Sequence, residues 1–341
     1  MAQLLSDNRN RIRFVQFAVR TLLSAIVAGY LASKLNWSVL GKLFSELHLG
    51  LVVLAFITIQ VGQSFSSLRW QWLAQPLGFR DSYTRFRTLF YVGTFFNLFL
   101  PTSIGGDAVR AWLLAGDKKH RLSAFSSVIA DRIAGVTAML IMACMASLTI
   151  AGEVPWWIPV LPWVLLAGLL ATVAMLAQFR SFSSKIEVLL MGLGWQEGRW
   201  LHWWKAVAIS FVVQGLATLQ IILLGIALGL QVPLTAYLVV VPMVTLMTML
   251  PLSLSGHGIR EGSLLILLAP YGVTTEQAIS LGLIWFTLSL GIGLIGGFLY
   301  VFSERARIPA LQDTLPSGKD SHEPIYRRAD EGRERQRQAA A

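Results

Sequence analysis

Two stretches of the chain share residue types and spacings that could bind an anion. Residues 100–110 read LPTSIGGDAVR and residues 250–260 read LPLSLSGHGIR. Leu, Pro, Ser, Gly and Arg recur at matching positions, so the two stretches form an internal repeat. Each interrupts an apolar region with Pro and Gly and ends on an arginine, a pattern typical of the binding site of a membrane transporter. The alternative is two unrelated tight turns that use common turn residues.

The chemistry that these motifs could perform is the binding of phosphate or carboxylate. A glycine-rich turn leading into a short helix offers free backbone N–H groups and the positive end of the helix dipole. The serine hydroxyls add donors, and the arginines can make bidentate contacts. We therefore predict substrate-binding residues in and beside both motifs: Asn97, Pro101, Ser103, Gly105, Gly106, Asp107, Arg110, Asp131, Arg132, Pro251, Ser253, Gly256, His257, Gly258, Arg260 and Glu261.

The two motif arginines also have a structural interpretation. Arg110 could pair with Asp107, three residues earlier, and Arg260 could pair with Glu261 or another neighbour. Charges inside a membrane are costly and usually functional, which favours contact with the substrate.

Four further residues leave alternatives open. Asp131 and Arg132 are either an ionisable pair inside a membrane span or interfacial anchors, if their helix begins late. His257 could couple proton movement to transport, or could simply form a hydrogen bond. Asn97 could cap the broken backbone or face a cavity.

The composition places these motifs in a membrane. The chain is 55% hydrophobic and only 13% charged, with a mean hydropathy of +0.62, whereas soluble domains are about one-quarter charged. The net charge of +10 indicates contact with anionic phospholipid headgroups rather than nucleic acid. Because Cys144 is the single cysteine, disulfides and a cysteine-ligated metal are excluded. No cofactor is expected.

The apolar segments predict an all-α polytopic membrane protein with about six transmembrane helices. We expect spans near 14–33, 49–68, 122–150, 158–177, 206–228 and 278–302. Arg69 and Trp70 are interpreted as markers of a membrane interface at the end of the second span, and tryptophans generally as interface anchors. Five glycines in the last span predict close helix packing.

Each motif lies between two apolar segments that are too short to cross the bilayer. We predict two re-entrant hairpins that enter from opposite faces. Basic residues fall almost entirely on one side of this topology, which predicts that both termini are cytoplasmic. Residues 1–302 are then a membrane domain, with inverted repeats at about 14–150 and 158–302. Residues 303–341 are predicted to be a disordered, basic cytoplasmic tail.

Four segments resemble a known family: 97–110, Arg69-Trp70, Asp131-Arg132 and 251–262. They look like the flippase-like family named for the transmembrane region of lysylphosphatidylglycerol synthase, which includes hopanoid-biosynthesis-associated membrane proteins. The resemblance covers about residues 14–302 and implies a lipid-flipping domain in the bacterial inner membrane. Ser255 and His257 depart from a more glycine-rich second motif. The bifunctional synthases add a soluble aminoacyl-transfer domain, which we do not expect here, so lysyl transfer is not expected.

These observations predict a transporter or flippase that moves an amphipathic lipid, anionic or polyprenyl-linked, across the inner membrane. One alternative is a hopanoid transporter or another membrane protein of hopanoid synthesis. An alternative from another class is a membrane-embedded transferase that acts on a lipid carrier, although the sequence offers no paired acids or histidine cluster for it. The expected partners are a membrane lipid substrate and anionic phospholipids, with lipid-biosynthesis enzymes as further candidates and no nucleic acid.

Overall fold

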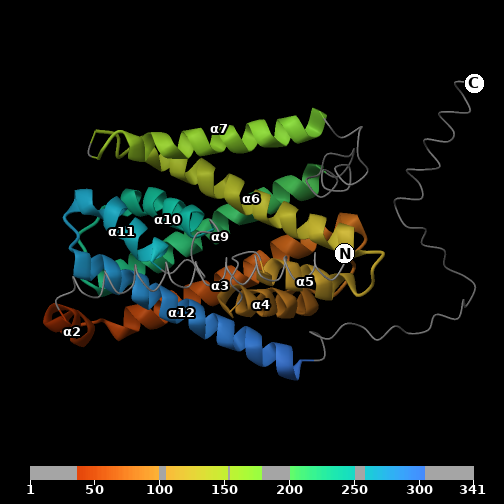
Figure 1. The fold of residues 1–341 in the computed structure, drawn as a ribbon, viewed down its shortest axis with the longest axis horizontal. Coiled ribbons are helices and arrows are strands. Elements are labelled where there is room, and N and C mark those ends of the chain that lie inside the picture. The colour runs from red at the N-terminus through yellow and green to blue at the C-terminus, as the bar shows by residue number, and fades with distance from the viewer. Residues whose placement is uncertain (1–36, 100–104, 153, 179–199, 250–257, 304–341) are drawn as a thin grey trace, which may run out of the picture.

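The computed structural model describes residues 37–99, 105–152, 154–178, 200–249 and 258–303. This part of the chain folds into helices joined by short turns (Figure 1). The helices are α2 (Trp37–Ser45), α3 (Leu49–Ala74), α4 (Tyr83–Phe99), α5 (Gly105–Ala115), α6 (Arg121–Ser147), α7 (Trp157–Gln178), α9 (Trp200–Ala227), α10 (Leu234–Met249), α11 (Ile259–Leu268) and α12 (Thr275–Phe302), with short 3-10 turns at Gln75–Leu77 and Ala269–Tyr271.

Among the described residues, five helices are long and apolar enough to cross a membrane. They cover Leu49–Leu77, Arg121–Ser147, Trp157–Leu176, Leu201–Ala227 and Thr275–Phe302. These correspond to the second through sixth predicted spans, and the predicted span at 14–33 lies outside the described residues. The chain is therefore an all-α polytopic membrane protein, as predicted.

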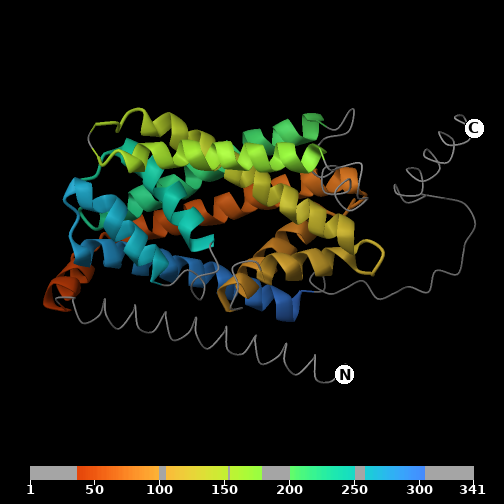
Figure 2. The ribbon, with the colours of Figure 1, turned by 45° about the horizontal axis from the view of Figure 1, so that its top comes forward.

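Helices α4, α5, α10 and α11 are all shorter than the roughly 20 residues that a helix needs to cross the bilayer. Helix α4 packs on α5, and α10 packs on α11. The first pair lies toward the right-hand end of the long axis in Figure 1 and the second toward the left-hand end, and Figure 2 keeps this separation. Their re-entry from opposite membrane faces stays a prediction.

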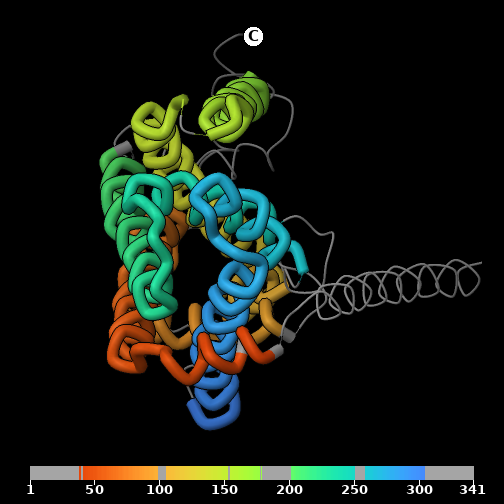
Figure 3. Tube along the Cα trace, turned by 90° about the vertical axis from the view of Figure 1, so that its left-hand side faces the viewer, coloured from red at the N-terminus to blue at the C-terminus, as the bar shows by residue number. Residues whose placement is uncertain are grey.

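The helix contacts repeat between the two halves. Helix α12 packs on α4, and α6 packs on α10 in the same way. Helix α6 also contacts α3 and α5, while α12 contacts α9 and α11. Helices α3 and α9, which share an extensive interface, occupy equivalent places in this scheme. Viewed end on, the helices of both halves surround one axis and α7 lies at the periphery (Figure 3).

The predicted close packing of α12 is confirmed. A Cβ atom at Gly296 would lie 2.0 Å from the backbone oxygen of Tyr91 in α4. A Cβ atom at Gly293 would lie 2.2 Å from a Leu98 side-chain carbon. Because real Cβ atoms do not approach other atoms so closely, glycine is what lets α12 and α4 touch.

The interpretation of Arg69 and Trp70 as interface markers is wrong. Helix α3 continues past them to Ala74, and their exposed fractions are 6% and 0%. The physical reason is tertiary: both side chains find partners inside the bundle, so neither needs the headgroup region. The interface interpretation fits Trp156 better, which is 76% exposed.

Candidate functional site

A cavity of about 370 Å³ lies between the two halves, and seven helices line it. The lining residues are Thr58, Ile59, Gly62, Gln63, Ser66 and Arg69 of α3; Phe90, Gly93, Thr94 and Asn97 of α4; Asp107 and Arg110 of α5; Asp131 and Arg132 of α6; Val213, Gln214, Ala217 and Gln220 of α9; Val241 and Thr245 of α10; and Trp285 of α12. Five of the predicted site residues therefore line this cavity: Asn97, Asp107, Arg110, Asp131 and Arg132.

The cavity lining repeats with the halves. One constant spacing relates Gln63 to Gln214, Ser66 to Ala217 and Arg69 to Gln220. The same spacing relates Thr94 of α4 to Thr245 of α10. The two halves thus present equivalent positions to one shared cavity, as expected for a site on the axis of an internal repeat.

Five charged side chains of the lining form a continuous chain of ion pairs. Asp131 accepts from Arg69 Nε at 2.7 Å and from Arg110 Nη2 at 3.0 Å. Asp107 accepts from Arg110 Nε at 3.1 Å and from Arg132 Nε at 2.7 Å. Three arginines and two aspartates leave one surplus positive charge.

Arg110 is the buried centre of this chain. Its guanidinium lies 4.6 Å from the ring centroids of both Trp70 and Phe90. Its side chain is only 3% exposed, and Nη1 has no hydrogen-bond partner among the described residues. The structural alternative, pairing with Asp107, is present, and Asp131 adds a second carboxylate.

Arg69 is held on the opposite flank of Asp131. Its Nη1 donates to Ser210 Oγ of α9 at 3.0 Å. A Cβ atom at Gly135 of α6 would lie 3.2 Å from Nη1, so glycine leaves room for the guanidinium. The ion-pair chain therefore ties α3, α5, α6 and α9 together around the cavity.

Arg132 is the solvent-accessible end of this series of ion pairs. Its side chain is 38% exposed, whereas those of Asp107 and Asp131 are 9% and 2% exposed. Its Nε is held by Asp107, and within the described residues its two Nη groups have no partner. Helix α6 begins at Arg121, so Asp131 and Arg132 lie well inside the helix rather than at its start.

Asn97 performs both of the roles considered for it. Its Oδ1 accepts from the backbone N–H of Gly106 at 2.8 Å, which caps the start of α5, and the residue also lines the cavity. A Cβ atom at Gly106 would lie 1.8 Å from the backbone oxygen of Gly93. The motif glycine therefore permits the close approach of α4 and α5.

The second motif is arranged differently. Arg260 lies over Trp285 at 5.2 Å and Phe286 at 6.0 Å, and is 8% exposed. Among the described residues its Nε and Nη1 have no hydrogen-bond partner. Glu261 does not pair with Arg260; its carboxylate accepts from the backbone N–H of Gly258 at 2.7 Å. Arg260 does not line the cavity, although Trp285 does.

Pro101, Ser103, Pro251, Ser253, Gly256 and His257 lie outside the described residues, so their predicted roles stay predictions. Gly105 begins α5, and Gly258 precedes α11 with φ +80°, a conformation that favours glycine.

Sequence reasoning missed the polar side chains of α3 and α9. Residues 61–69 read VGQSFSSLR and residues 212–220 read VVQGLATLQ. Val, Gln and Leu recur there in register, which is the signal that could have found Gln63 and Gln214. The match also aligns Arg69 with Gln220.

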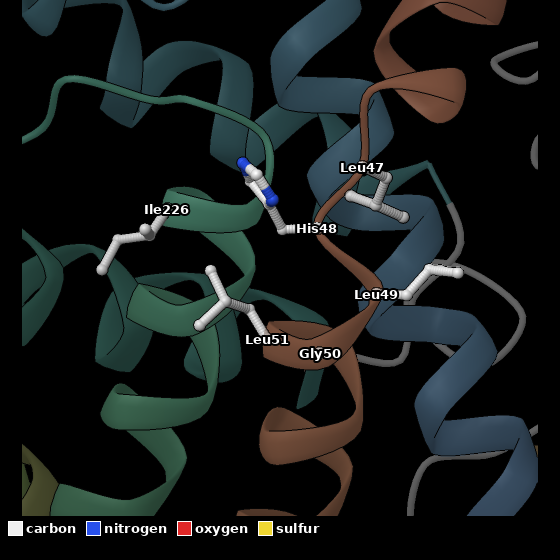
Figure 4. A pocket seen from close by; sticks show the side chains of 6 residues that line it. All are labelled: Leu47, His48, Leu49, Gly50, Leu51 and Ile226. Atoms are coloured by element: carbon white, nitrogen blue, oxygen red, sulfur yellow. The ribbon is translucent and has the colours of Figure 1, made fainter.

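A second hollow, of about 710 Å³, lies where the turn before α3 meets the end of α9. Leu47, His48, Leu49, Gly50, Leu51 and Ile226 line it (Figure 4). This lining is apolar apart from His48, so the hollow lacks the charged groups that make the first cavity a candidate site.

Residues 17–297 match the family model of the lysylphosphatidylglycerol synthase TM region. The chain belongs to this family. The match covers the cavity lining from both halves. The ion-paired residues of the first half and the neutral lining residues of the second half therefore both fall within the matched domain. A comparison with curated proteins gave no match.

Proposed function

We propose that this protein moves an amphipathic lipid with an anionic headgroup across the bacterial inner membrane. The single observation that carries the proposal is the surplus positive charge in the cavity between the two halves. The headgroup binds in this cavity while the acyl or polyprenyl tail stays in the bilayer.

Arg132 is the proposed contact for the anionic group. Its Nε is fixed by Asp107, which leaves two Nη groups in a fork that suits a phosphate or carboxylate. The side chains of the other two cavity arginines, Arg69 and Arg110, are only 8% and 3% exposed, so they hold the carboxylates in place rather than make the first contact with the headgroup.

Movement of the two helix pairs would expose the cavity to each face in turn. Glycine contacts at α4–α5 and α4–α12 allow backbones to slide with little side-chain obstruction. Alternating access by opposed inverted repeats is a common transporter design. With this topology both termini are cytoplasmic.

Two alternatives use the cavity less well. A hopanoid with an uncharged headgroup would leave the surplus charge without a counter-ion. A membrane-embedded transferase needs a free carboxylate or a metal, yet Asp107 and Asp131 each accept from two arginines. Transport without chemistry at the lipid is therefore the preferred function.

The test is transbilayer movement of fluorescently labelled phosphatidylglycerol in proteoliposomes. We expect Arg132→Gln to slow it about tenfold or more, because a charge-assisted contact contributes about 1.5–3 kcal/mol. Arg121→Gln is the matched control, an exposed arginine at the start of the same helix. Equal rates in both variants and the wild type would contradict the anion site, and movement of an uncharged triterpenoid alone would favour the hopanoid alternative.

A further inference from the structure

Asp107 is shared between an arginine on its own helix and an arginine on a neighbouring helix. It lies in the first turn of α5 and accepts from Arg132 Nε of α6 at 2.7 Å. It also accepts from Arg110 Nε, one turn further along α5, at 3.1 Å. The carboxylate can therefore give up Arg132 and still keep a cationic partner, so that breaking the contact between the helices does not leave a buried charge uncompensated.

An anion bound to Arg132 competes with Asp107. The side chain of Arg132 is 38% exposed and that of Asp107 only 9%, so an anion reaches the arginine first. A phosphate or carboxylate on the Nη groups would lie beside the Asp107 carboxylate, because a single guanidinium would then hold both. Like charges this close repel, and burial limits the screening by water and salt. Anion binding therefore weakens the contact between Asp107 and Arg132.

The start of α5 is fixed to α4, so the two helices move together there. Asn97 Oδ1 of α4 accepts from the backbone N–H of Gly106 at 2.8 Å, and a Cβ atom at Gly106 would lie 1.8 Å from the backbone oxygen of Gly93. The other ion pair between α5 and α6, from Arg110 Nη2 to Asp131 at 3.0 Å, lies one turn further along α5. Loss of the Asp107 contact thus frees the start of α5 and the end of α4, with Arg110 and Asp131 as the pivot.

The second helix pair has no equivalent contact. Glu261 is the third residue of α11, as Asp107 is of α5. Its carboxylate accepts from the backbone N–H of Gly258, at the start of its own helix. Arg260 packs on Trp285 of α12, and within the described part of the chain no ion pair joins α11 to α12. An anion therefore has no interhelical ion pair to displace here.

We propose that Asp107 couples headgroup binding to movement of the first helix pair. An anion at Arg132 displaces Asp107, and the start of α5 separates from α6 together with the end of α4. The second pair, α10 and α11, does not respond to the anion directly. This inference rests on the proposed function, because the displacing anion is the headgroup bound at Arg132.

The experiment is amide hydrogen exchange with mass spectrometry on the purified full-length protein. The protein is placed in vesicles of phosphatidylcholine, with or without added phosphatidylglycerol. Exchange of the α5 amides reports local opening of that helix, and α11 is the internal control. We expect phosphatidylglycerol to speed exchange in α5 about tenfold and to leave α11 unchanged, since one charge-assisted hydrogen bond changes an opening equilibrium by about that factor or more. A lipid that only covered its site would slow exchange instead.

Asp107→Asn removes the carboxylate that the anion displaces. In this variant α5 should exchange about tenfold faster than in the wild type already in phosphatidylcholine, with no further change on adding phosphatidylglycerol. Arg132→Gln breaks the same contact from the side of α6 and should give the same result, which keeps the test valid if the first variant does not fold. Asp117→Asn is the matched control, because this exposed carboxylate pairs with His120 in the loop after α5, and it should respond as the wild type.

Transbilayer movement of labelled phosphatidylglycerol, measured in the same vesicles, separates the two proposals. If Arg132→Gln slows this movement but the lipid leaves α5 exchange unchanged or slower in the wild type, the coupling through Asp107 is overturned and the proposed function stands. Faster exchange in both α5 and α11 would show a general loosening by the lipid and would also overturn the coupling. Equal movement in Arg132→Gln and the wild type would overturn the anion site itself.

Discussion

The two halves present equivalent positions to one cavity but different chemistry. Every charged residue of the described lining comes from the first half, while the second half contributes Gln214, Gln220, Thr245 and Trp285. The position of Arg69 in the first half is occupied by Gln220 in the second. The duplication therefore accounts for the equivalent positions around the cavity. Divergence has left the charged residues of the described lining on helices of the first half.

The two motif arginines show the same divergence. Arg110 pairs with Asp107 and Asp131 and packs on Trp70, whereas Arg260 rests on Trp285 with no ion pair among the described residues. One motif arginine is locked into the helix framework and the other is not. Equal sequence positions thus do not imply equal roles.

The largest expected effect on stability comes from Asp131, which pairs with both Arg69 and Arg110. Asp131→Asn leaves Arg69 and Arg110 buried with one fewer counter-charge, and breaking a buried ion pair costs about 3–5 kcal/mol. We expect a large fall in the midpoint of thermal unfolding in detergent, with Arg69 no longer held against α6.

Glu46→Gln is the control, because it removes an exposed pair with Lys42, in which the two side chains are 66% and 74% exposed. Such exposed pairs contribute at most about 1 kcal/mol. Equal midpoints for the Asp131 and Glu46 variants would show that the buried ion pairs do not hold the helices together.

A smaller effect distinguishes the motif arginines. Arg110→Met removes two charge-assisted bonds and should lower the free energy of unfolding by about 2–3 kcal/mol. Arg260→Met removes a buried guanidinium whose Nε and Nη1 have no partner among the described residues, so its loss should change stability by under about 1 kcal/mol. Denaturant unfolding monitored by tryptophan fluorescence measures both. Losses of equal size would mean that the two motifs stabilise the fold alike.

The sequence predicted the helical membrane fold because hydropathy and length alone specify spans. It also placed Asp107, Arg110, Asp131 and Arg132 among the candidate substrate-binding residues, because charges inside a membrane are costly and usually functional. The family match agrees with the helical membrane fold.

The sequence could not show which charges pair. Arg69 and Asp131 are 62 residues apart, and their contact depends on how α3 packs on α6. An Arg-Trp pair in the sequence can mark a membrane interface or a buried site. The sequence alone does not distinguish the two, so the interface prediction for Arg69 is wrong. That Gln63 and Gln220 line the cavity likewise follows from packing, although the repeat between α3 and α9 signals their positions.

The most direct test of the shared, positively charged cavity uses single cysteines at Thr94 and Thr245, with Cys144 replaced by alanine. Each is labelled with an anionic sulfonate and with a cationic trimethylammonium methanethiosulfonate reagent, with and without added phosphatidylglycerol. The account predicts faster reaction with the anionic reagent at both positions, and protection of both by the lipid. A faster cationic reaction, or protection at neither position, would contradict it.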